Sequence, residues 1–143
     1  MAQLDSISSN LPIFVIDTDS LEILDDPRIL AHMGIIYNEV DQINHSTDPF
    51  NNYSGKINIE IRGYTSQFFA KKSYGFETQY DDGTNFNVSL LGLPAENDWI
   101  LYGPHSDKTL IRNILSYKLS RELGHYAPRT KLCELILNGE YRG

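Results

Sequence analysis

Two runs of strict two-residue alternation constrain the fold of this chain more than any other feature. Residues 56–62 place three isoleucines on one face and polar side chains on the other, and residues 71–78 place Lys72, Tyr74 and Phe76 on one face. Successive side chains of a strand point to opposite faces, so this pattern predicts two β-strands. The polar loop between them makes the pair a hairpin.

Other short apolar runs predict more strands. They cover residues 11–16, 32–37, 86–91, 99–102 and 130–137, with turn-forming residues between them. Apolar residues also recur at helical spacing, which predicts one main helix at about 107–123. The residues of this stripe are Leu110, Ile111, Ile114, Leu115, Leu119 and Leu123. Ser106 or Asp107 can cap the N-terminus of the helix, and Gly124 suits its C-terminal end. We therefore expect an α+β domain, an antiparallel sheet of about five strands with this helix packed on it.

The last residues predict a turn. Asn138-Gly139 favours a type I′ hairpin, yet only four residues follow Gly139. We therefore expect that residues 1–143 are a single domain and the N-terminal part of a longer protein. An unpaired edge at 130–137 would then favour pairing with another copy of the chain, an edge-strand homo-oligomer.

Charge and composition exclude several classes of partner. The chain carries a formal net charge of −7, which opposes nonspecific binding to nucleic acid or to anionic membranes. No apolar run approaches the ~18 residues that a membrane span needs. Cys133 is the single cysteine, so the sequence predicts neither an intrachain disulfide nor a cysteine metal site. We expect no metal ligands in this chain.

Three cations flank the loop of the first hairpin. Arg62 precedes the loop, and Lys71 and Lys72 follow it. A planar guanidinium binds phosphate oxygens well, and an inward-facing Lys72 needs an anionic partner. Within the loop, Gly63 lets the backbone approach a ligand, and Thr65 and Ser66 offer hydroxyl and N–H groups. These residues together predict a binding site for an anion.

A purely structural interpretation competes with this one. Arg62 and Lys71 can be charges that protect an edge strand from aggregation, and Lys72 can pair with Glu60 or Glu77. Neither GxxxxGK[ST] nor GxGxxG occurs in the sequence. The pattern alone leaves both interpretations open.

A second basic group lies at the start of the predicted helix. Lys108 and Arg112 are four residues apart, so they share a helix face and repel one another. An anion near the helix N-terminus would favour them, whereas the alternative is a solvated basic face. His105 is a possible acid or base, although a single loop histidine usually has no catalytic role. No catalytic residue is assigned.

Many short motifs in one order resemble the CotH-type atypical protein kinases, first known as spore-coat proteins. The matching segments are IEIRGYTSQFFAKKSYGFET (59–78) and the stretch from SLLGLP to NGEYRG (89–143). LPIFVIDT near the start is similar to the entry strand of bacterial surface members. The resemblance covers roughly residues 56–143.

The resemblance implies a protein-kinase-like N-lobe that binds nucleotide. By match, Arg62, Gly63, Thr65 and Ser66 form a phosphate-covering loop, Lys71 or Lys72 binds the nucleotide phosphates, and Lys108 and Arg112 belong to a signature helix start together with Asp107 and Asn113. The alternation favours Lys72 over Lys71.

The resemblance also implies an activity for the full-length parent. It would use ATP and Mg²⁺ to phosphorylate Ser or Thr of extracellular or coat proteins, and it would be secreted or at the cell surface. Metal-binding and base carboxylates belong to the C-lobe of such a kinase, so this chain alone would be inactive and would require no cofactor. The alternative is a non-catalytic adhesion or assembly module on the same scaffold.

Overall fold

The computed structural model describes residues 6–143. Its strands are β1 (Ser8–Ser9), β2 (Ile13–Asp17), β3 (Ile29–Ile36), β4 (Asn44–His45), β5 (Tyr53–Arg62), β6 (Ser73–Gln79), β7 (Asp98–Leu101), β8 (Glu134–Leu137) and β9 (Glu140–Tyr141). Its helices are the 3-10 turn η1 (Thr65–Phe68) and the α-helix α1 (Arg112–Glu122).

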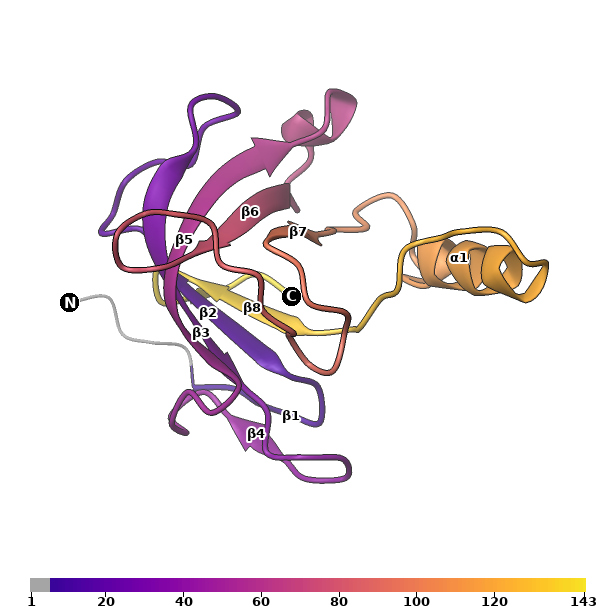
Figure 1. Ribbon diagram of the computed structural model, residues 1–143, viewed down its shortest axis with the longest axis horizontal. Coiled ribbons are helices and arrows are strands. Elements are labelled where there is room, and N and C mark those ends of the chain that lie inside the picture. The colour runs from indigo at the N-terminus through magenta and orange to yellow at the C-terminus, as the bar shows by residue number, and fades with distance from the viewer. Residues whose placement is uncertain (1–5) are drawn as a thin grey trace.

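Seven of these strands form one curled sheet in the order β7-β6-β5-β3-β2-β8-β9, and β1 pairs with β4 in a separate ribbon (Figure 1). All neighbours in the large sheet are antiparallel except β2 and β8, which are parallel. The expectation of about five antiparallel strands is therefore wrong. Alternation identifies a strand but not its partner, and the long connection through α1 returns the chain to β2 in the parallel direction.

The predicted hairpin of β5 and β6 is confirmed. Ile59 pairs with Phe76, Ile61 with Tyr74, and Arg62 with Ser73 at the neck. β3 lies on the other side of β5 and β7 on the other side of β6, so both strands are interior. The role of edge protection that the sequence left open for Arg62 and Lys71 therefore does not apply.

The main core lies on one face of the sheet. Its fully buried members include Ile57 and Ile59 from β5 and Met33 and Ile35 from β3. The segment between β6 and β7 closes over this face and buries Leu90, which is only 2% exposed. Residues 86–91, predicted as a strand, are thus a covering segment that makes only an isolated bridge, from Val88 to Glu96.

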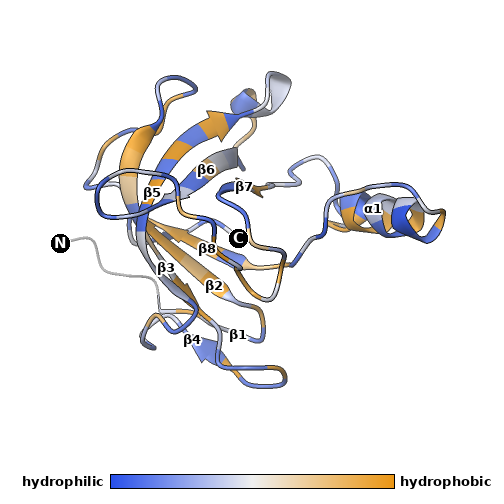
Figure 2. Ribbon diagram, viewed as in Figure 1, coloured by the Kyte–Doolittle hydropathy of each residue, from blue (hydrophilic) through white to orange (hydrophobic). Residues whose placement is uncertain are grey.

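The helix differs most from expectation. α1 begins at Arg112 rather than 107, contains no buried residue, and stands apart from the sheet (Figure 1). Leu115 and Leu119 are 52% and 51% exposed. The expected packing of helix on sheet, and with it the kinase-like N-lobe, is therefore wrong. The covering segment around Leu90 already occupies the core face. Figure 2 shows apolar residues on α1 although no strand covers them.

The hairpin at Asn138-Gly139 is confirmed, with positive φ angles of 50° and 82°. Because β9 pairs with one side of β8 and β2 with the other, β8 is not an open edge. The basis for edge pairing at 130–137 is therefore absent. Within residues 6–143, no helix has the length and apolar content that a membrane crossing requires.

Candidate functional site

The loop at the neck of the β5–β6 hairpin, residues 63–72, is held by its own polar groups. Gly63 has a φ of +93°, and a Cβ at this position would lie 1.9 Å from Oγ of Ser66. Ser66 Oγ donates a hydrogen bond to the Arg62 carbonyl at 3.3 Å, and the Gln67 amide donates to the Gly63 carbonyl. Glycine is therefore required where the loop turns back on itself. We call residues 63–72 the neck loop.

The two lysines of the neck loop have different partners. The Lys72 ammonium group donates a hydrogen bond to the Gln67 carbonyl, inside the loop. Lys71 extends toward the C-terminal hairpin, where its Nζ lies 2.7 Å from the position that a Cβ on Gly143 would take. β6 begins only at Ser73, so strand alternation does not determine the direction of either lysine.

The carboxylates that the sequence offered to Lys72 are used elsewhere. Arg28 makes ion pairs with Glu60 at 2.9 Å and with Glu77 at 3.0 Å. It also lies 3.7 Å from Asp98. These pairs join β5, β6 and β7 through one guanidinium, so pairing of Lys72 with Glu60 or Glu77 is not observed.

The neck loop contacts the turn that leads to α1. The Phe69 and His105 rings are stacked with centroids 5.0 Å apart. Gly103 donates its N–H to Ser73 Oγ at 3.0 Å, and a Cβ at Gly103 would lie 2.3 Å from the Lys72 carbonyl. The neck loop is therefore joined by direct contacts to the turn at residues 103–105.

Asp107 fixes the start of α1 from upstream. Its carboxylate accepts hydrogen bonds from the Thr109 hydroxyl at 2.6 Å and from the Arg112 N–H at 3.0 Å. The hydrogen bond from Thr109 is the main reason why the pKa of Asp107 lies below its usual value. Asp107 thus bonds to the first residue of α1, but it is not the predicted N-cap, because the helix begins after Ile111.

Arg62, Gly63, Ser66, Lys71 and Lys72 all line one large hollow of about 1860 Å³ between the sheet and the chain around α1. Thr65, Lys108 and Arg112 are not among its lining residues. Arg112 instead lies 3.4 Å from Asp107 in an ion pair, and Lys108 is exposed. The structure thus brings together five of the eight predicted site residues.

Sequence reasoning missed other cations of the hollow. Arg142 comes from the C-terminal hairpin, and Arg121, Arg129 and Lys131 come from the end of α1 and the segment after it. Among the described residues, seven of the chain's twelve lysines and arginines line the hollow, against four of its nineteen acidic residues. The hollow is therefore basic in an acidic protein. A count of charge along the chain would have found some of these cations, because residues 108–133 carry a net charge of +5.

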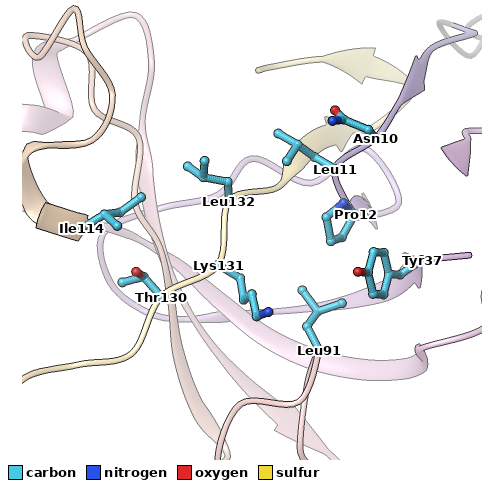
Figure 3. A pocket seen from close by; sticks show the side chains of 9 residues that line it. All are labelled: Asn10, Leu11, Pro12, Tyr37, Leu91, Ile114, Thr130, Lys131 and Leu132. Atoms are coloured by element: carbon cyan, nitrogen blue, oxygen red, sulfur yellow. The ribbon is translucent and has the colours of Figure 1, made fainter. Parts of the chain in front are cut away.

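A smaller pocket of about 280 Å³ continues the hollow at the base of α1 (Figure 3). In Figure 3 the Lys131 side chain extends toward Leu91, and Tyr37, Leu11 and Pro12 line the same pocket. One cationic group therefore lies among apolar side chains at this end.

Cys133 also borders the hollow but is not a reactive thiol. Burial raises the pKa of Cys133 to about 11, so the nucleophilic thiolate is scarce at neutral pH. In the part of the chain from residue 6 onward, no three His, Cys, Asp or Glu side chains are grouped so that they could hold a metal ion.

The sequence matches the model of one protein family, described as "CotH kinase protein", over residues 59–143. The match includes the neck loop, α1 and the C-terminal hairpin. No curated protein matches the chain.

Proposed function

This chain belongs to the CotH kinase family, and from that premise we propose that its neck loop binds the phosphates of ATP for a CotH-like protein Ser/Thr kinase. The observation that carries the proposal is the concentration of cations in the hollow of a protein with a net charge of −7. Phosphate groups are the part of a nucleotide that such a surface attracts.

The residues of the neck loop suit phosphate oxygens, which accept hydrogen bonds. We assign Arg62 as the guanidinium that binds them from the end of β5, and Lys71 as a second donor from the other side of the neck. Lys72, bonded to the Gln67 carbonyl, holds the loop in shape. Gly63 lets the loop turn back so that the Ser66 hydroxyl packs against it.

ATP, with Mg²⁺ on its phosphates, supplies the transferable phosphoryl group when it is bound. The chain's own residues bind the phosphates and orient them, and we assign no Mg²⁺ ligand to the described residues. The acceptor in this proposal is a serine or threonine of an extracellular or coat protein, and the protein works at the cell surface.

The test is calorimetric titration of the chain with Mg²⁺-ATP, compared with Arg62→Ala and Lys71→Ala. Loss of a charged hydrogen bond to phosphate weakens binding by about tenfold or more. Lys118→Ala is the matched control, because Lys118 is an exposed lysine on α1 that does not line the hollow. Unchanged affinity in both neck variants, or an equal loss in Lys118→Ala, would show that the neck loop is not the phosphate site.

A further inference from the structure

The segment from Lys108 to Cys133, which we call the arm, differs in charge from the rest of the protein. It holds six of the twelve lysines and arginines but only one of the nineteen acidic residues. The arm includes α1 and projects from the sheet (Figure 1). A basic segment on an otherwise acidic protein marks a surface for an anionic partner.

One face of the arm is directed at the hollow and is apolar as well as basic. Ile114, Tyr117 and Arg121 line the hollow from α1, and Leu110 and Ile111 line it from the turn before the helix. Leu110 and Ile111 are 48% and 47% exposed, so nothing within the described chain covers them fully. A partner must therefore offer apolar side chains in addition to negative charge.

The size and shape of this space distinguish between classes of partner. At about 1860 Å³, the hollow leaves room beyond the roughly 300–1,000 Å³ that a typical small-molecule site occupies. A membrane surface cannot enter a concavity between the arm and the sheet, and the net charge of −7 opposes its approach. A second copy of α1 would be repelled, because residues 112–122 carry three cations and one acid. A polypeptide segment with acidic side chains meets both requirements.

The pocket at the base of α1 is suited to the anchor of such a segment. Lys131 lies there among Leu11, Pro12 and Leu91 (Figure 3). An acidic residue of the segment would pair with the Lys131 ammonium, and a neighbouring leucine or isoleucine would fill the apolar pocket. Arg129, exposed on the same segment, supplies the next cation.

We propose that the hollow between the arm and the sheet is a docking groove for an acidic polypeptide segment that carries apolar anchor residues. Lys131, Arg129 and Ile114 make the main contacts with this segment. The phosphate site proposed at the neck loop lines the same hollow, but Lys131, Arg129 and Ile114 are not among the residues assigned to it. The inference therefore goes beyond the proposed nucleotide binding and does not depend on it.

The experiment is fluorescence anisotropy with a labelled peptide in which leucines recur every three or four residues among glutamates. A matched peptide replaces every glutamate with glutamine. We expect the acidic peptide to bind and to weaken as salt is added, and the glutamine peptide to bind at least tenfold less well. Equal binding of the two peptides would overturn the proposal.

Variants locate the site. Arg129→Gln with Lys131→Gln should weaken binding about five- to tenfold, and Ile114→Ser should weaken it further. The control pair Lys108→Gln with Lys118→Gln removes the same charge from exposed positions outside the hollow. An equal loss in the control pair would mean nonspecific attraction and would overturn the proposal.

Two further results separate this inference from the function proposed above. Arg62→Ala, which should weaken Mg²⁺-ATP binding, should leave peptide binding within about twofold. Sedimentation velocity of the chain alone should show a monomer. A dimer that the Ile114→Ser variant dissociates would show that a second copy fills the groove, contrary to the proposal.

Discussion

The ring of Phe69 stacks on the ring of His105, with centroids 5.0 Å apart and planes inclined by 23°. Through this contact the neck loop meets the turn before α1, thirty-six residues further along the chain. Phe68, its neighbour, is 86% exposed. The two adjacent phenylalanines therefore have different roles, and this difference can be measured.

We expect Phe69→Ala to lower the free energy of unfolding by about 0.5–1.5 kcal/mol, the value of an aromatic pair. Phe68→Ala should change it by less than about 0.5 kcal/mol, as is usual for an exposed side chain. Urea unfolding of both variants measures the difference. Equal losses would show that the stacked pair does not fix the loop.

The ion pairs of Arg28 with acidic residues of β5, β6 and β7 should stabilise the folded protein. Arg28→Met leaves Glu60, Glu77 and Asp98 close together without their cation, and we expect a loss of about 1–3 kcal/mol. In a Glu60→Gln/Glu77→Gln background the same change should cost less, because the repulsion is gone. A double-mutant cycle in urea measures this coupling, and additive losses would argue against it.

Asp107 should make the arm sensitive to acid. The pKa of Asp107 is lowered in the folded protein from the usual 3.8. The carboxylate therefore stabilises the folded state above the unfolded pKa, and this stabilisation is lost as the pH falls through the folded pKa. The melting temperature of Asp107→Asn should thus lie below that of the wild type at pH 6, and the gap should narrow below about pH 4. Ser106→Ala is the control, and a gap independent of pH would contradict the assignment.

The exposed stripe of α1 gives a sharp test of the fold. Ile59 is fully buried, whereas Leu119 is 51% exposed. We expect Ile59→Ala to cost about 2–5 kcal/mol and Leu119→Ala less than about 0.5 kcal/mol, since alanine also favours the helix. Thermal or urea unfolding compares them. A large loss for Leu119→Ala would mean that α1 packs on the sheet after all.

The sequence by itself determined the local elements of this protein. Alternation identified the β5–β6 hairpin, because side chains of a strand point to its two faces in turn and the sequence shows this two-residue period. Asn138-Gly139 identified the last turn, because this pair tolerates the positive φ angles that the turn requires. The motif order over residues 56–143 also indicated the family, and the family match over 59–143 confirms it. The anion site at Arg62 and Lys72 stays a prediction.

Only the tertiary structure decided how these elements combine. Leu90, in a segment without regular structure, covers the core face that α1 was expected to cover, and β8 returns parallel to β2. A helical stripe shows which side chains share a face but not what that face contacts. For the same reason, only the tertiary structure shows that Arg129, Lys131 and Arg142 line the same hollow as Arg62 and Lys71.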